Sequence, residues 1–69
     1  MTNYAICHIP SADIQSGATM AFDYQPEVIQ VLPVRQAAQR RADNWNAEDE
    51  NSVYYVARTP LAVTDWYFD

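Results

Sequence analysis

The sequence predicts an α+β domain, in which a small, mainly antiparallel sheet of four to five strands carries one amphipathic helix. Three observations predict this class. Segments of alternating or β-branched apolar residues flank one longer segment of helical periodicity. The chain has 69 residues, which suffice for a single domain spanning 1–69. Hydrophobic residues make up 49% of it and aromatic residues 13%, and large rings give a short chain much of the buried area that it needs.

The N-terminal segment predicts a strand followed by a turn. Asn3–Ile9 is mostly apolar and includes aromatic and β-branched residues, as strands do. Pro10 ends this strand because it has no N–H to donate to a neighbouring strand. Ser11–Gly17 is expected to be a loop or a single helical turn, with Ser11 as candidate N-cap and Gly17 as the C-terminal stop.

Two further segments before the helix also favour strands. Thr19–Tyr24 alternates with period 2, which is typical of a half-buried strand. The residues that share its apolar face are Met20, Phe22 and Tyr24. Glu27–Leu32 favours a strand through its β-branched residues. Pro26 would permit a short helix there instead, because proline is tolerated at a first helical position.

The helix is predicted over Pro33–Asn46. Proline suits a first helical turn, and apolar residues then recur at spacings of three and four. This stripe consists of Val34, Ala37, Ala38, Ala42 and Trp45. The other side is polar and is expected to face water, and a polar, acidic loop follows over 46–52.

A C-terminal hairpin is predicted after the acidic loop. Its strands are Ser52–Arg58 and Ala62–Phe68, and Thr59–Leu61 connects them with turn-forming residues. Because neighbours on a strand point to opposite faces, about half of the hairpin's aromatic rings must lie outside a one-sided core. An exposed aromatic patch marks an interface. One hypothesis is therefore a structural or regulatory subunit that self-associates through this hairpin, so that the protein is a monomer or a homodimer.

Charge and cysteine content restrict the partners and the compartment. The net charge is −5, from nine carboxylates against four arginines, and there is no lysine. Such a chain repels nucleic acid and anionic membranes, so we expect neither to bind directly. It is attracted to basic surfaces. A single cysteine, Cys7, cannot form an internal disulfide, which fits a reducing cytosol. No signal peptide is recognisable, and we expect a cytoplasmic protein.

Catalytic, cofactor and metal motifs are not evident in the sequence. Cys7 and His8 are adjacent on a predicted strand, so they point to opposite faces and cannot easily form a nucleophile–base pair. We expect Cys7 in the core and His8 at the surface. One cysteine and one histidine are too few for a zinc site, and one glycine excludes glycine-rich phosphate loops. An enzyme that uses His8 with a carboxylate stays a minor alternative.

Acidic residues near the end of the helix are the candidate partner-binding site. The candidates combine carboxylates with one aromatic ring: Asp43, Trp45, Glu48, Asp49, Glu50, Asp65 and Asp69. Carboxylates spaced across a rigid surface can imitate phosphates, and arginines that hold a nucleic-acid backbone would accept them. The expected partner is therefore a protein with a basic groove.

In length, acidity and mixed α/β pattern, with the acidic positions beside aromatic strands, the chain resembles small phage-encoded inhibitors, the anti-CRISPR proteins. The resemblance is one of character and involves no shared motif. It implies a non-catalytic inhibitor, in some cases a nucleic-acid mimic, that covers the surface on which a CRISPR effector holds DNA or guide RNA. It also implies that the protein acts in the cytoplasm of the host cell.

Overall fold

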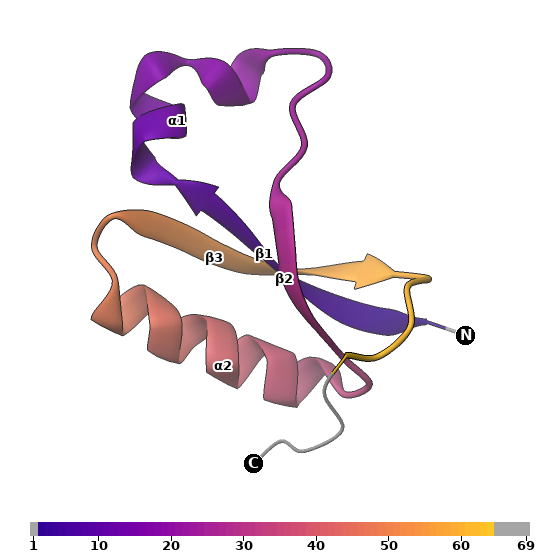
Figure 1. Ribbon diagram of the computed structural model, residues 1–69. Helices are drawn as coiled ribbons and strands as arrows, with labels where there is room; N and C mark the ends of the chain where they lie inside the picture. Colours follow the sequence, from indigo (N-terminus) through magenta and orange to yellow (C-terminus); the bar gives the residue numbers. More distant parts are fainter. Residues whose placement is uncertain (1, 65–69) are drawn as a thin grey trace.

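The computed structural model describes residues 2–64, which form a three-stranded antiparallel sheet and one main helix (Figure 1). Strand β1 (Asn3–Pro10) lies between β2 (Glu27–Leu32) and β3 (Ser52–Thr59) and is antiparallel to both. The predicted α+β class is confirmed. The described residues contain three strands, where we expected four to five. Glu27–Leu32 takes the strand conformation that its β-branched residues favoured over a helix.

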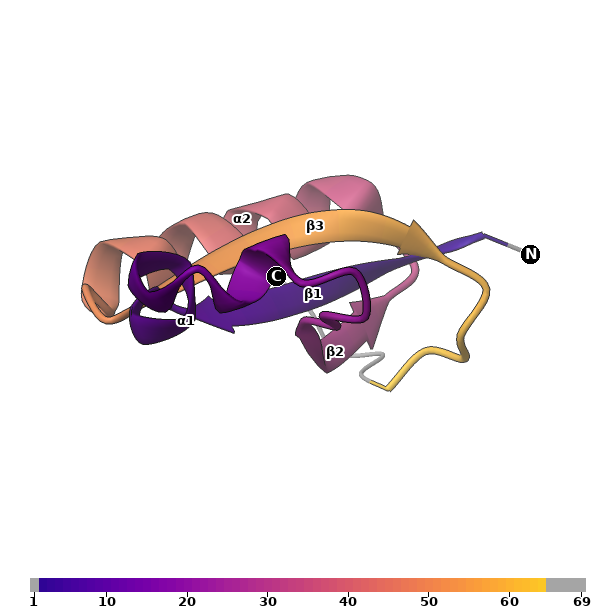
Figure 2. The same cartoon turned by 90° about the horizontal axis from the view of Figure 1, so that it is seen from above.

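Helix α2 (Arg35–Glu48) connects β2 to β3 and covers one face of the sheet, which Figure 2 shows from above. It begins two residues later than predicted. Pro33 precedes it, and Val34 is an extended N-cap residue that is 43% exposed. Val34 therefore does not belong to the buried stripe. Within residues 2–64 we find no helix with the length and apolar character that crossing a membrane requires.

The core occupies both faces of the sheet. On the helix face, Ile6, Leu32 and three alanines of α2 are buried, and Trp45, Tyr54 and Val56 pack around them. Alanine lets the helix approach the strands closely, and the rings fill the margins. On the other face, Ala5, Cys7 and Val31 are buried against Tyr55 and Ala57. The predicted core position of Cys7 is confirmed, whereas His8 is half-buried on the helix face.

An arm of short turns, residues 11–26, joins β1 to β2. It contains helix α1 (Ser11–Ser16) and the 3-10 helix η1 (Ala18–Met20). The expected helical turn is present and Gly17 ends it with φ 81°, but the N-cap is Pro10, not Ser11. The predicted strand Thr19–Tyr24 is wrong. Its backbone instead forms local turns, in which the Ala21 N–H donates to the Ala18 carbonyl and the Tyr24 N–H donates to the Ala21 carbonyl, both over 3.1 Å.

The C-terminal segment does not form the predicted hairpin over the residues that the structure describes. After β3 the chain crosses to the outer edge of β2. The Thr64 N–H donates to the Val31 carbonyl over 2.9 Å, and the Val31 N–H donates to Thr64 Oγ1 over 2.8 Å. Thr64 therefore bonds to the outer edge of β2 and not to β3. The rest of the predicted strand, 65–68, falls outside the described residues.

Candidate partner-binding surface

One end of the molecule collects most of the predicted acidic residues. Asp43, Trp45 and Glu48 lie in the last turns of α2, and Asp49 and Glu50 lie in the turn that leads into β3. The start of α1 is fixed to this turn, since the Ser11 N–H donates to the Asn51 carbonyl over 2.8 Å. Figure 1 shows the turn at one extremity of the fold, between α2 and α1. We call this region the acidic end. Asp65 and Asp69 lie outside the described residues.

Asp49 shapes the acidic end but is itself engaged. Its Oδ1 accepts the Asn51 N–H and its Oδ2 accepts the Tyr54 hydroxyl, both over 2.9 Å. These hydrogen bonds, the backbone one first, lower the pKa of Asp49 below its usual value. The carboxylate therefore stays ionised and holds the turn. It adds to the field of the acidic end, whereas a partner would have to contact its free neighbours Glu48 and Glu50.

Asp43 and Glu48 belong to different sides of α2. They are five residues apart, so they lie roughly 140° apart around the helix. Asp43 is exposed and accepts a hydrogen bond from Gln39 Nε2 over 3.0 Å. Glu48 lies two turns after Arg41, whose Nη1 donates to Gln30 on β2 over 2.8 Å, so Glu48 shares the flank of α2 that faces β2. The predicted residues therefore share one end but not one face.

Glu27 is a member of the acidic end that sequence reasoning missed. The antiparallel register places it opposite His8, and its Oε2 lies 3.7 Å from His8 Nδ1. His8 in turn packs against the Tyr54 ring, whose hydroxyl binds Asp49. Glu27 is 69% exposed and adds a carboxylate on the β2 side. Only the strand register reveals this neighbour, because Glu27 is 19 residues from His8 in the sequence.

His8 and Ser52 form a close polar pair beneath this surface. His8 Nε2 lies 2.7 Å from Ser52 Oγ, a distance at which a base can activate a nucleophile. Glu27, however, is too far from Nδ1 for a hydrogen bond and is largely solvated. Ser52 also contributes to the lowered pKa of Asp49, so the carboxylate competes with the imidazole for the single hydroxyl proton. We therefore interpret the pair as part of the network that ties the turn to β1.

Trp45 supports the acidic end from the core side. Its ring lies 5.4 Å from the Tyr54 ring and packs against the core, so it is half-buried. Its predicted role as an aromatic contact next to the carboxylates would use the exposed part of the indole. Because Trp45, Tyr54 and Asp49 are linked through contacts, the surface has a rigid base.

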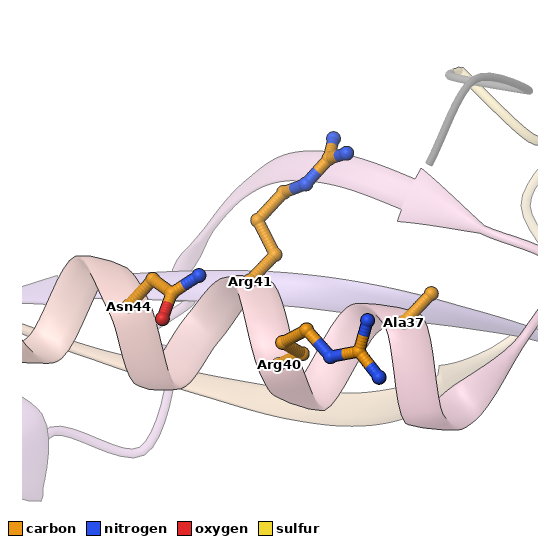
Figure 3. A pocket seen from close by; sticks show the side chains of 4 residues that line it. All are labelled: Ala37, Arg40, Arg41 and Asn44. Carbon is orange, nitrogen blue, oxygen red and sulfur yellow. The ribbon is translucent and has the colours of Figure 1, made fainter. Parts of the chain in front are cut away.

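The middle of α2 carries a small, open pocket lined by Ala37, Arg40, Arg41 and Asn44 (Figure 3). The two arginine side chains diverge from its rim, and Arg41 reaches Gln30. The positive charge of α2 therefore lies before its carboxylates along the helix. Within residues 2–64 no three histidine, cysteine or carboxylate side chains gather in a way that could hold a metal ion.

Comparison with known proteins gives this chain no relative. No protein-family model, no curated protein and no solved structure matches it. An inference about its function therefore depends on the geometry of the acidic end.

Proposed function

We propose that this protein is a small, non-catalytic inhibitor that binds a basic groove on another protein through its acidic end. The target class is a protein that holds nucleic acid in that groove, and the resemblance described above suggests a CRISPR effector complex. The carboxylates would occupy the positions of backbone phosphates. Arginine accepts both groups through the same bidentate geometry.

The observation that carries this proposal is the gathering of Glu27, Glu48, Asp49 and Glu50 at one end of a rigid frame. These residues come from two separate segments, which the β1–β2 and β1–β3 pairings bring together. Apart from Asp49, which the turn holds, they are exposed. A fixed set of exposed negative charges loses little entropy on binding and attracts a basic partner at long range.

Self-association through a C-terminal hairpin is supported less well. That hypothesis needs a second strand beside β3, and Thr64 instead bonds to Val31 on β2. The rings of Tyr54 and Tyr55 are half-buried on opposite faces of the sheet, so β3 does not present them as one exposed patch.

The test measures inhibition of purified effectors. CRISPR effector complexes of several types, each loaded with guide RNA, would be mixed with the protein, and target-DNA binding would be followed by gel mobility shift at low and high salt. We expect stoichiometric inhibition that weakens as salt rises, because surface charges are screened. If no effector loses DNA binding at an excess of the protein, the proposed target is wrong.

Two variants with the same change in charge locate the contact. Glu48→Gln and Asp43→Asn each remove one carboxylate from α2, from different sides of the helix. We expect Glu48→Gln to weaken inhibition roughly fivefold, as loss of a favourable rim charge does, and Asp43→Asn to change it little. Equal effects of both variants would mean that net charge, and not the side of α2 that carries Glu48, determines binding.

A further inference from the structure

Two large apolar side chains in the arm stand fully in solvent. Met20 is 86% exposed and Phe22 is 106% exposed, the two highest values among the large hydrophobic residues that the structure describes. Ile14, in the same arm, is 46% exposed. Single exposed apolar residues are ordinary. Two large ones within three residues of one ordered turn, both almost fully exposed, are unusual and are what an interaction site would present. We call Met20 and Phe22 the apolar knob.

The arm that carries the knob is an ordered series of turns. The Met20 N–H donates to the Gly17 carbonyl over 3.0 Å, and the Ala21 and Tyr24 N–H groups continue the series over 3.1 Å each. The Tyr24 hydroxyl donates to Asp13 over 2.9 Å, which closes the arm on itself. A side chain that is held in place before binding loses less entropy when it enters a partner.

The knob lies in the middle of an arm whose two ends meet the acidic end. The arm begins at Ser11, which is fixed to the turn through Asn51, and it ends where Glu27 begins β2. Figure 1 shows the arm beside this end of the sheet and clear of α2. An apolar anchor on an arm that joins the acidic end supplies, together with those carboxylates, the apolar and charged groups that protein–protein interfaces combine.

The charges of the arm indicate which kind of partner would bind the knob. Residues 11–26 contain two carboxylates, Asp13 and Asp23, and no basic residue. In a symmetric dimer the same patch would face itself, so these carboxylates would approach their own copies in a pair of chains that already carry −5 each. A second copy is therefore disfavoured, and a partner of opposite charge is favoured.

We propose that the knob is the apolar anchor of the interface, inserting into an apolar socket that arginine or lysine side chains border on the partner protein. The inference rests on the proposed function for its partner class, and it assigns the main contact to residues outside the carboxylate set. Phenylalanine supplies a large contact area, and methionine adapts its shape to the wall of the socket.

Site-specific photocrosslinking tests this assignment. A benzophenone amino acid would replace Phe22, Glu48 or Gln36 in three separate variants, each expressed in CRISPR-bearing bacterial cells and irradiated. Gln36 is an exposed control at the start of α2. We expect an adduct from position 22 whose partner peptide contains apolar residues next to arginine or lysine, and none from position 36. Competition with unlabelled protein should remove the adduct, and competition with the Phe22→Ser variant should do so about tenfold less well.

The other outcomes separate the two proposals. An adduct from position 48 without one from position 22 would overturn the anchor and leave the acidic-end proposal standing. An adduct from position 22 to a second copy of this chain would overturn the basic partner. No adduct from either position would count against both proposals. Phe22→Ser should unfold at the same denaturant concentration as the wild type, so misfolding cannot explain a loss of competition.

Discussion

Asn46 closes the outer edge of β3 with its side chain. Its Nδ2 donates to the Tyr54 carbonyl and its Oδ1 accepts the Tyr54 N–H, both over 2.8 Å. The amide thus replaces the strand that an edge residue lacks. Asn46→Ala removes both hydrogen bonds, each worth a net ~0.5–1.5 kcal/mol. Because water reaches this exposed position, we expect the pair to contribute about 1–2 kcal/mol to the free energy of unfolding.

Urea unfolding followed by far-UV circular dichroism measures this contribution, with Asn44→Ala as the matched control. Asn44 lies on the same helix, roughly 200° around it from Asn46, and gains the same helix propensity from alanine. Asn46→Ala should be the less stable of the two by about 1–2 kcal/mol. Asn46→Asp should be no more stable than Asn46→Ala, because a carboxylate would face the Tyr54 carbonyl. Equal stability of the two alanine variants would refute the role of this side chain.

Four further predictions concern the core, the pH dependence and the polar network. Leu32→Ala should cost about 2–5 kcal/mol, comparable to the whole ~3–5 kcal/mol of a domain this small, so near-UV circular dichroism should show an unfolded chain. The lowered pKa of Asp49 implies stability that is complete above its ordinary pKa of 3.8 and lost as pH falls through its folded-state pKa. Asp49→Asn should reduce this loss of stability at acid pH, measured by urea unfolding at a series of pH values. The pKa of Tyr54 is raised, first by its hydrogen bond to Asp49, which implies stability that is present below pH 10.0 and lost as pH rises through the folded pKa. Tyr54→Phe should reduce this loss of stability at alkaline pH. Ser52→Ala and His8→Ala should hydrolyse p-nitrophenyl acetate at the wild-type rate, and a large drop for Ser52→Ala would instead indicate a catalytic serine.

The sequence predicted well those elements whose own residue pattern already indicates which of their side chains are buried. The alanine stripe of α2 specifies a helix through its own periodicity, and Ala37, Ala38 and Ala42 are buried as expected. The central strand is equally self-evident, because β1 is apolar on both faces and is covered on both. Local pattern and tertiary environment agree in these segments, so either one predicts the structure.

Thr19–Tyr24 failed because alternation describes a strand's faces but not its neighbour. Met20, Phe22 and Tyr24 share the spacing of a half-buried strand, yet the segment pairs with none of the three described strands and satisfies its backbone through local turns. The same reason applies to residues 62–64, the described part of the predicted strand Ala62–Phe68, whose predicted partner was β3 by nearness in sequence. Thr64 bonds to Val31 instead, 33 residues away. Pairing over such separations is set by the assembled sheet and cannot be read from a short pattern.

The candidate site was predicted as a region but not in its members. Runs of acidic residues are visible in any sequence, which is why Glu48, Asp49 and Glu50 were found. Their roles depend on geometry: Asp49 is engaged by Asn51 and Tyr54, and Asp43 falls on another side of the helix. Glu27 joins the group through the β1–β2 register alone.

Glu48 separates the requirements of the fold from those of the proposed function. It lies in the last turn of α2, where a negative charge opposes the helix dipole by ~0.3–1 kcal/mol. Asp49 offsets a similar cost with its hydrogen bonds, but Glu48 is exposed and gains no such support in the fold. Glu48→Lys should therefore raise the free energy of unfolding by up to about 1 kcal/mol while weakening inhibition of the effector. A variant that is less stable than the wild type would show that Glu48 serves the fold, and one that inhibits fully would show that binding does not need it.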